Sequence, residues 1–452
     1  MKPEQPEPGA PGRSLADRWR RRARTGSWVV ADQAVVSGSN FLAVVLLARM
    51  LGPEEFGIYA WAIIGLQLLS EIPAAVILAP HNVIGARLVD RAYAIHTSTM
   101  AVLQLAISLG TAVLLAIAAA VVQALFSGGG EVLLALAALA ISWQAREFVR
   151  RVLQTAGRWS GALISAAIGG GSQVAVILLL HAGGALNATV ALWILVMAST
   201  LAAIAGLLQV RYGIVRSFRV ADVREAWMMG RWLLGSSAVS QVGRYVNGMI
   251  LPIVAGPGSF GLYRAVSQLV GLIDLPIKAL GNFLRPSLSR RSMQGVPPVR
   301  AVVHPLLASG GTALFLAAII AGLFGRDILR AVYGDEYVVI ANLVFFVALY
   351  PLFTFGRIVL DSAIIALDPS PRAVLYAATA GSLGAVVVGP VSILAFGVNG
   401  APASVITAGA ITFGVLWSAW RATMRRAAPR HGKGTAPPTG RASNLAAEED
   451  RS

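Results

Sequence analysis

The sequence predicts an all-α membrane protein of about twelve transmembrane helices, arranged as two pseudo-symmetric six-helix lobes around a central cavity. Three observations support this fold class. The 452 residues are 56% hydrophobic and 13% charged, with a mean hydropathy of +0.70, whereas soluble proteins are about one quarter charged. Apolar runs long enough to cross a bilayer recur along the whole chain. Basic residues gather between alternate runs, as they do in cytoplasmic loops.

Each predicted span is an apolar run of about 20 residues, the length that crosses the hydrocarbon core. An arginine-rich segment precedes the first run, and we expect it to lie on anionic lipid rather than to act as a twin-arginine export signal. The predicted spans are residues 28–50, 57–79, 97–125, 131–148, 160–181, 188–209, 232–254, 259–282, 302–324, 338–366, 373–396 and 402–421.

Arginine clusters mark every second connection, while the intervening connections carry no Lys or Arg except for one that holds Arg326 and Arg330. The positive-inside rule therefore places both termini in the cytoplasm and the chain in the cytoplasmic (inner) membrane, which requires an even number of spans. The predicted organisation is a disordered, basic cytoplasmic segment (1–27), an N-terminal lobe (28–220), a C-terminal lobe (221–425) and a disordered cytoplasmic tail (426–452).

An internal repeat relates the two predicted lobes. The segment LGPEEFGIYAWAIIGLQLLSEIP begins at Leu51, and AGPGSFGLYRAVSQLVGLIDLP begins at Ala255. Chance is the alternative explanation, because Gly-Pro turns are common. Parallel six-helix halves are typical of transporters that bind their substrate between lobes. The matching residues, at an offset of 204, are Gly52, Pro53, Phe56, Gly57 and Tyr59 with Gly256, Pro257, Phe260, Gly261 and Tyr263; one deletion later, Glu71 and Pro73 match Asp274 and Pro276.

Charged side chains inside the predicted spans should face protein or water, since a charge at mid-bilayer costs about 2.5–3.5 kcal/mol. Most of them lie in the repeat-related spans, which predicts a polar cavity between the lobes. The cations are Arg244, Arg264, Lys278 and Arg357; the acids, considered as gating or coupling groups, are Asp32, Glu71, Asp274 and Asp361; the uncharged groups are Asn40, Gln67, Gln241, Asn247 and Gln268.

Structural explanations remain open for several of these groups. Asp274 with Lys278 is spaced i, i+4, as is Arg357 with Asp361, so each pair could neutralise itself. Arg264 and Lys278 lie near span ends and could extend to the interface. Asp32 lies near the cytoplasmic end and could be solvated, and Glu71 could accept local hydrogen bonds. Arg244 differs because it is central and has no acidic neighbour on its own helix, which favours a functional role.

Soluble-enzyme motifs are missing from the sequence. It contains no GxxxxGK[ST] phosphate loop, no GxGxxG after a strand and no HExxH. The chain has no cysteine, and its five histidines show no ligand spacing, so we expect no metal site and no cofactor. The net charge of +16 is confined to short clusters between apolar runs, which argues against nucleic acid as a partner.

Four segments resemble the polysaccharide-biosynthesis flippases of the multidrug, oligosaccharidyl-lipid and polysaccharide exporter superfamily. LLARMLGPEEFGIYA (46–60) resembles the first hairpin of that family, and SFGLYRAVSQLVGLIDLPIKALGNFLRPSLSR (259–290) its eighth span. LFGRDILRAVYGDEY (323–337) is similar to its ninth connection, and IIALDPSPRAVL (364–375) to the turn before span 11. Many members carry an acidic residue just before the arginine of span 7, whereas here Gly243 precedes Arg244, which puts ion coupling through this span in doubt.

This resemblance implies a flippase, not an enzyme, for a polyprenyl-pyrophosphate-linked oligosaccharide such as an O-antigen, exopolysaccharide or teichoic-type unit. It implies membrane lipids, a polysaccharide polymerase and glycosyltransferases as partners, and a chain that acts as a monomer. The four cations would then bind the diphosphate. The alternatives are a drug or metabolite exporter of the same superfamily, a membrane-embedded glycan-processing enzyme and a scaffold for a synthesis complex. Short outer connections argue against the enzyme.

Overall fold

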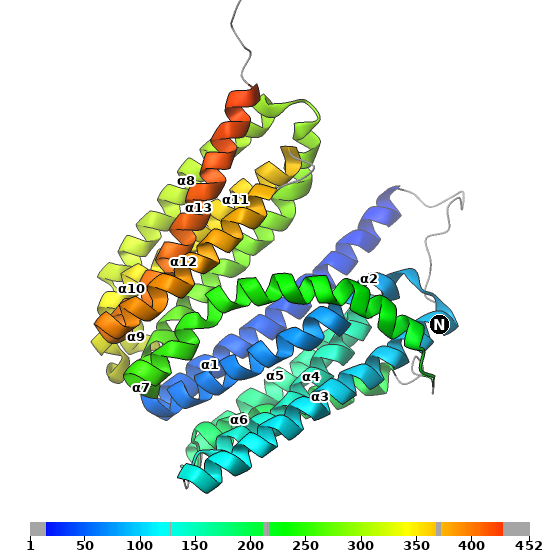
Figure 1. Cartoon of the computed structure of the whole chain (residues 1–452), viewed down its shortest axis with the longest axis vertical. Coiled ribbons are helices and arrows are strands. Elements are labelled where there is room, and N and C mark those ends of the chain that lie inside the picture. The colour runs from blue at the N-terminus through cyan, green and yellow to red at the C-terminus, as the bar shows by residue number, and fades with distance from the viewer. Residues whose placement is uncertain (1–14, 127, 211–214, 216, 368–371, 428–452) are drawn as a thin grey trace, which may run out of the picture.

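The computed structural model describes residues 15–126, 128–210, 215, 217–367 and 372–427. All regular elements in this part of the chain are helical, and Figure 1 shows them as two bundles. The N-lobe comprises α1 (Leu15–Pro73), η1 (Ala74–Leu78), α2 (Ala79–Ile84), η2 (Gly85–Arg87), α3 (Asp90–Phe126), α4 (Gly130–Thr155), α5 (Trp159–Ala182) and α6 (Ala188–Val210). The C-lobe comprises α7 (Val220–Ser292), α8 (Val296–Leu323), α9 (Gly325–Val332), η4 (Asp335–Ile340), α10 (Ala341–Ala348), α11 (Tyr350–Leu367), α12 (Arg372–Phe396), η5 (Gly397–Gly400) and α13 (Ala401–Ala427).

The predicted all-α membrane fold is confirmed. Nine helical segments within the described residues are long and apolar enough to cross a membrane. Three of these segments are 58, 48 and 54 residues long, which is more than twice the roughly 20 residues that one crossing needs. The count of twelve spans stays a prediction, as do the disordered ends, since residues 1–14 and 428–452 lie outside the described part of the chain.

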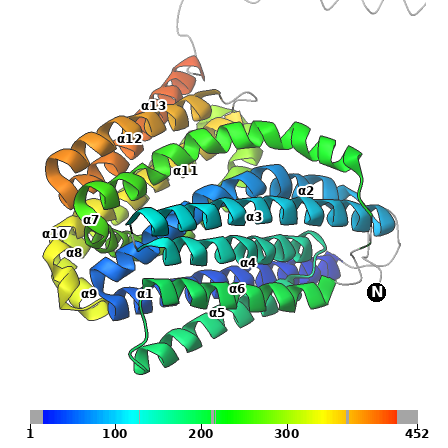
Figure 2. The same cartoon turned by 60° about the horizontal axis from the view of Figure 1, so that its bottom comes forward.

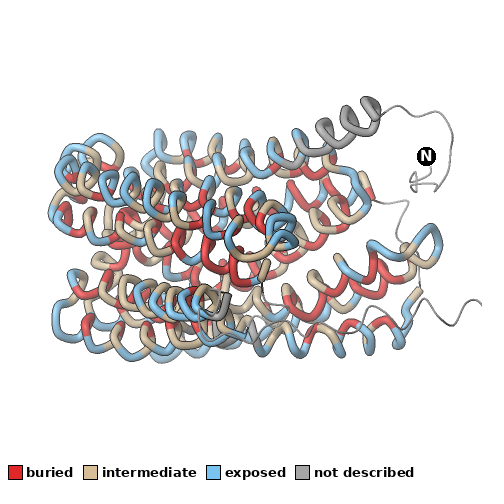
Figure 3. Tube along the Cα trace, turned by 90° about the horizontal axis from the view of Figure 1, so that it is seen from above, coloured by how far each residue is buried: buried red, intermediate tan, exposed pale blue. Residues whose placement is uncertain are grey.

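The outer surface of the bundles is apolar, as a bilayer requires. Leu105, Leu109, Val113 and Leu114 of α3 are between 46% and 70% exposed. Figure 3 shows buried positions toward the middle of the molecule and exposed positions on its outer sides. Large exposed apolar faces would promote aggregation in water, whereas lipid chains solvate them. The chain is therefore a multi-pass membrane protein.

Two long helices, α1 and α7, reverse direction at a glycine (Figure 1). One hydrophobic cluster packs around both reversals and contains residues of both lobes, whereas a second cluster lies within the C-lobe. The two bundles meet at the reversals and diverge toward the end where α1 begins and α13 finishes (Figure 1). The lobes therefore share this core at the end where the bundles meet.

The first turns of α7 pack on the N-lobe. Ala226 and Leu234 belong to a hydrophobic cluster with Ile77, Met100 and Phe148, and Figure 2 shows α7 running along α2 and α3 before it reaches the C-lobe. The predicted division of the chain at residue 220 stays a prediction. What the structure adds is that α7 lies against both lobes, so any relative movement of the lobes must bend or tilt this helix.

Candidate functional site

Two glycine-proline turns set the geometry of the region where the lobes meet. Gly52 and Gly256 have φ values of 73° and 82°, a conformation that residues with a Cβ atom rarely adopt. A proline follows each glycine, and its fixed φ suits the first turn of the helix that begins there. Equivalent residues of the predicted repeat thus take the same unusual backbone conformation.

The helices that follow these turns cross at two further glycines of the repeat. A Cβ atom added to Gly57 would overlap the carbonyl oxygen of Pro257 and lie 2.5 Å from its carbonyl carbon. A Cβ atom added to Gly261 would overlap the carbonyl oxygen of Pro53 and lie 3.0 Å from its carbonyl carbon. The two contacts are reciprocal, as in an interface with two-fold symmetry. Only glycine allows the two backbones to approach this closely.

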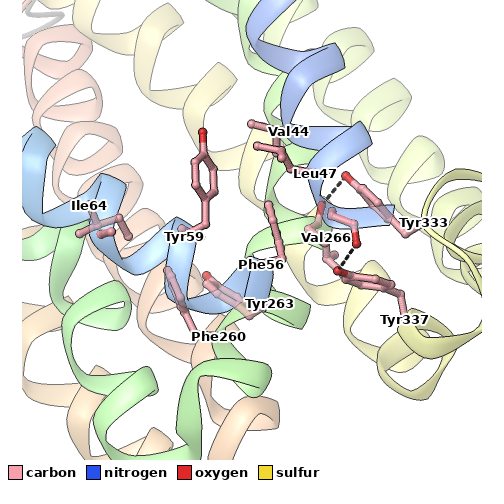
Figure 4. Close-up of a cluster of buried hydrophobic side chains, with 14 of the residues drawn as sticks. Val44, Leu47, Phe56, Tyr59, Ile64, Phe260, Tyr263, Val266, Tyr333 and Tyr337 are labelled. Atoms are coloured by element: carbon pink, nitrogen blue, oxygen red, sulfur yellow. Dashed lines mark hydrogen bonds between the residues drawn. The ribbon is translucent and has the colours of Figure 1, made fainter. Parts of the chain in front are cut away.

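Aromatic side chains of the repeat surround the glycine crossing. Phe56 and Phe260 are each 1% exposed, and Tyr59 and Tyr263 are 5% and 9% exposed. Figure 4 shows these four rings in the cluster that both lobes share. Burying a large aromatic side chain contributes about 1.5–3 kcal/mol. These rings therefore help to hold the lobes together at the crossing.

A short segment of the C-lobe, residues 325–340, contacts both bent helices, and we call it the clasp. Tyr337 Oη donates a hydrogen bond of 2.7 Å to the carbonyl oxygen of Ala48 in the N-lobe. Tyr333 Oη donates one of 3.0 Å to the carbonyl oxygen of Ala265 in α7 (Figure 4). Arg49 donates in the opposite direction, over 3.1 Å, to a carbonyl oxygen of α9. The clasp thus links the lobes immediately beside the glycine crossing.

An inter-lobe cavity of about 570 Å³ lies next to the crossing. Ile64 and Gln67 contribute to it from the N-lobe, and α7, α10, α11, α12 and α13 contribute from the C-lobe. Among the described side chains, its charged lining residues are Arg264, Arg357 and Asp274. Two cations and one carboxylate leave a positive surplus, and charges in a poorly solvated cavity interact more strongly than they do in water.

The structure separates the four predicted cations. Arg264 is half-buried and Arg357 is exposed, and both line the inter-lobe cavity. Lys278 is exposed, lies 3.8 Å from the carboxylate of Asp274 and is not a lining residue. The side chain of Arg244 lies outside the described residues, so its role stays a prediction.

The two predicted i, i+4 pairs behave differently. Asp274 pairs with Lys278 as its spacing allows, and it is 7% exposed. Arg357 and Asp361 are both described, yet no ion pair joins them; Asp361 is 7% exposed and lines neither cavity. Arg357 therefore interacts with the carboxylate on its own helix only at a longer range than an ion pair, so its exposed guanidinium is available to a ligand.

The remaining predicted acids have partners on other helices. Asp32 is 2% exposed and accepts hydrogen bonds from Arg150, at 2.7 Å, and from Gln154, at 3.2 Å. It is therefore a buried, paired group and not a solvated one. Glu71 of the N-lobe accepts a hydrogen bond from Gln241 of α7, so this carboxylate joins the two lobes instead of accepting only local hydrogen bonds.

The predicted uncharged groups divide into lining and structural residues. Asn40 lines a second cavity, and Gln67 lines both. Asn247 is buried and also borders the inter-lobe cavity, but its Nδ2 donates a hydrogen bond of 2.7 Å to the carbonyl oxygen of Ala401. Gln268 is half-buried and lines neither cavity.

The second cavity, of about 510 Å³, lies in the N-lobe. The sequence assigned Arg146, Arg150 and Arg151 to a cytoplasmic connection or its border, but α4 continues to Thr155 and carries all three into this cavity's wall. Sequence reasoning named Asn40 and Gln67 but missed Gln104, Gln144 and Gln173, although a single polar residue inside an apolar helix is a usable signal. The lining includes Gln33, Ser37, Asn40, Gln67, Ser70, Glu71, Gln104, Trp143, Gln144, Arg146, Glu147, Arg150, Arg151 and Gln173.

Two histidines that looked isolated in the sequence meet in the fold. His81 and His96 are fully buried and stack with ring centroids 5.5 Å apart. Asp222, in the first turn of α7, lies 3.7 Å from His96 Nδ1. No group of three or more His, Asp or Glu side chains within the described residues is arranged to hold a metal ion.

Comparison with known proteins identifies the family and the fold. The model of the family described as "Polysaccharide biosynthesis protein" matches residues 23–290. No curated protein sequence matches the chain. The structure of "Lipid II flippase MurJ, inward closed conformation" is similar with a TM-score of 0.68 and 14% identity, covering 87% of each chain. The "inward-facing conformation of a multidrug resistance MATE family transporter of the MOP superfamily" has a TM-score of 0.59 and 13% identity, covering 89% of this chain and 96% of that one.

Proposed function

The chain belongs to the polysaccharide biosynthesis protein family, and from this premise we propose that it is a flippase. Its substrate would be a polyprenyl-pyrophosphate-linked oligosaccharide, such as an O-antigen, exopolysaccharide or teichoic-type unit. The observation that carries the proposal is the inter-lobe cavity, where Arg264 and Arg357 exceed the single carboxylate of Asp274. A site of this charge suits an anionic substrate.

The chemistry of the substrate explains why such a cavity is needed. A diphosphate group is anionic, and an isolated charge cannot enter hydrocarbon without a large free-energy cost. Arginine presents a planar fork of donors that matches phosphate oxygens, and charge-assisted hydrogen bonds are about twice as strong as neutral ones. Arg264 and Arg357 therefore provide a polar route for the diphosphate while the prenyl chain stays in lipid.

Alternating access supplies the transport step. The lobes are joined at the glycine crossing and by the clasp, and they diverge at the end where α1 begins and α13 finishes. With both termini in the cytoplasm, the diverging end faces the cytoplasm and the crossing faces outward. Release to the outside then requires that the glycine contacts and the hydrogen bond between Tyr337 and Ala48 break.

This orientation can be measured directly. Reporter domains fused after Gly183 should lie outside the cytoplasm, and those fused after Arg291 should lie inside it. A non-cytoplasmic reporter after Arg291 would refute the proposed topology. The same orientation would allow cytoplasmic glycosyltransferases to supply the substrate and a polymerase to use it on the outer side. In this proposal the flippase acts as a monomer.

An exporter of drugs or metabolites is the alternative that the shared fold supports, because one of the similar structures is a multidrug transporter. A cavity for cationic drugs should be acidic and aromatic. The charged lining of the inter-lobe cavity is mainly basic, which favours the anionic lipid. A glycan-processing enzyme has less support, since the family and fold match transporters.

Gene deletion in the native host tests the proposal. Loss of the protein should abolish the surface glycan and cause its lipid-linked precursor to accumulate on the cytoplasmic leaflet. Wild type and Arg300→Gln should restore display, because Arg300 is exposed and lines neither cavity. Arg264→Gln and Arg357→Gln should not restore it at equal abundance. An unchanged glycan in the deletion strain would overturn the proposed function.

A further inference from the structure

We infer that the N-lobe cavity is a binding subsite for the uncharged pyranose sugar that adjoins the diphosphate of the substrate. This inference rests on the proposed function and assigns a second compartment to the same substrate. The inter-lobe cavity would hold the diphosphate, and the N-lobe cavity would hold the sugar. Three features of the N-lobe cavity point to a neutral, hydroxyl-rich ligand beside the diphosphate: its charge balance, its amides and the border that it shares with the inter-lobe cavity.

The charges around the N-lobe cavity neutralise one another. Arg150 lies 2.7 Å from Asp32, and Arg146 lies 3.0 Å from Glu147. The wall also includes the carboxylate of Glu71 and the guanidinium of Arg151, whereas Asp32 is not itself a lining residue. When this buried partner of Arg150 is counted, three carboxylates balance the three arginines. A ligand with a net charge would gain little from this wall, in contrast to the positive surplus of the inter-lobe cavity.

Uncharged hydrogen-bonding groups make up most of the remaining polar wall, and they come from α1, α3, α4 and α5. An amide side chain offers two donors and one acceptor oxygen, so a set of amides can bond hydroxyl groups in many orientations. Trp143 adds an aromatic surface with the Arg146 guanidinium 4.1 Å from its ring centroid. Sugars present hydroxyls at the ring edge and C–H groups on the ring faces, which amides and indole rings respectively complement. The uncharged polar lining residues are Gln33, Ser37, Ser39, Asn40, Gln67, Ser70, Gln104, Gln144, Ser165 and Gln173.

One pair of amides retains unused hydrogen-bonding capacity. Gln104 Nε2 donates to Gln144 Oε1 over 2.9 Å, and Ser108 Oγ donates to the same oxygen over 2.8 Å. Gln104 Oε1 and Gln144 Nε2 have no partner within the described part of the chain, although these two residues are 96–97% buried, with exposures of 4% and 3%. Exchanging N and O in both amides still leaves one donor and one acceptor. A hydroxyl group, which both donates and accepts, satisfies such a pair.

The two cavities share part of their lining. Gln67 and Tyr245 border both of them. A molecule that joins a diphosphate to a sugar can therefore place each part in the cavity that suits its charge. The volume of about 510 Å³ for the N-lobe cavity lies within the roughly 300–1,000 Å³ typical of small-ligand sites.

Binding measurements on the purified full chain test the subsite. Native mass spectrometry would give dissociation constants for undecaprenyl pyrophosphate and for the same lipid carrying one glucose, galactose or N-acetylglucosamine. At least one glycosylated lipid should bind the wild type about 2- to 10-fold more tightly, the range expected for one or two additional neutral hydrogen bonds. Trp143→Ala and Asn40→Ala should lose this gain and still bind the unglycosylated lipid as the wild type does. Asn40 is exposed, so its variant should fold normally.

Controls distinguish failure of the subsite from failure of the proposed function. Trp193→Ala removes a tryptophan that is 43% exposed and lines neither cavity, and it should keep the gain. Arg264→Gln should weaken binding of all the lipids. Two outcomes would overturn the subsite alone. The wild type could bind glycosylated and unglycosylated lipids with equal affinity, or the tighter binding of glycosylated lipid could survive in both Trp143→Ala and Asn40→Ala. No binding of any of the lipids would overturn the proposed function together with it.

Discussion

Replacing Gly57 by alanine should open the glycine crossing and expose the inter-lobe cavity to the outer side. The added Cβ would lie 2.5 Å from the carbonyl carbon of Pro257, whereas carbon atoms in contact are about 3.5 Å apart. The helices must therefore separate by about 1 Å. Backbone atoms on the partner helix cannot move aside as a flexible side chain would. Overpacking of this kind costs about 1–3 kcal/mol, and it destabilises only the conformation in which the crossing is closed.

A shift of about 1–3 kcal/mol changes the ratio of closed to open molecules about 5- to 150-fold. Because the chain has no cysteine, one introduced thiol reports this ratio without background labelling. Ser267 lines the inter-lobe cavity, and its Oγ donates a hydrogen bond of 2.9 Å to the carbonyl oxygen of Tyr263 on its own helix, so the similarly sized thiol of Ser267→Cys should be tolerated. An impermeant maleimide added outside intact cells should label this thiol at least 5-fold faster when Gly57→Ala is present.

A matched control uses the same substitution two helical turns away. A Cβ added to Gly65 would meet no atom within 4 Å, so Gly65→Ala should leave labelling unchanged while altering helix propensity equally. Gly261→Ala tests the reciprocal contact and should act in the same direction as Gly57→Ala. Unchanged labelling in both crossing variants at normal abundance would show that the crossing does not close the cavity, and the reasoning would fail.

Three further substitutions test individual groups. Arg244→Ala should abolish glycan display at normal abundance, and Arg244→Lys should keep part of it, because charge survives but the bidentate fork does not; full display with alanine would remove Arg244 from the site. Tyr337→Phe deletes the 2.7 Å hydrogen bond to Ala48, which contributes about 0.5–1.5 kcal/mol. External labelling of the Ser267→Cys thiol should therefore become about 2- to 12-fold faster. A labelling rate equal to that of the protein with Tyr337 would show that the clasp is not a barrier. Glu71→Gln should slow transport and alter its pH dependence if this carboxylate gates the lobes, whereas reduced abundance alone would indicate a structural role.

The sequence could predict the fold because membrane spans and turns depend on local patterns. Apolar length marks the helices, and the Gly-Pro pairs mark both reversals, since glycine tolerates positive φ and proline begins a helix. The repeat predicted equivalent helices, and Gly52 and Gly256 confirm it in their backbone angles. Nothing in the pattern indicates which faces of these helices meet, so the contact between Gly57 and Pro257 could not be foreseen.

The candidate site was harder to predict because its contacts join distant parts of the chain. Tyr337 and Ala48 are 289 residues apart, and the polar tip of a tyrosine gives no sign of its partner. Arg150 follows a predicted span and looked like a loop residue, yet it neutralises Asp32 inside the N-lobe. Charge counts along a sequence therefore do not separate loop cations from cavity cations.

The two repeat-related carboxylates show how the lobes have diverged in function. Both lie two residues before a proline, and both were considered as gating or coupling groups. In the structure Glu71 accepts a hydrogen bond from Gln241 across the lobes, whereas Asp274 pairs with Lys278 on its own helix. A group that joins the lobes in one conformation stabilises that conformation, while a group paired within one helix can keep its partner in both. Of the two, Glu71 is therefore the better candidate to shift the equilibrium between the conformations of the lobes. Asp274 is better placed to limit the positive charge of the inter-lobe cavity, so that a diphosphate can bind and can also be released.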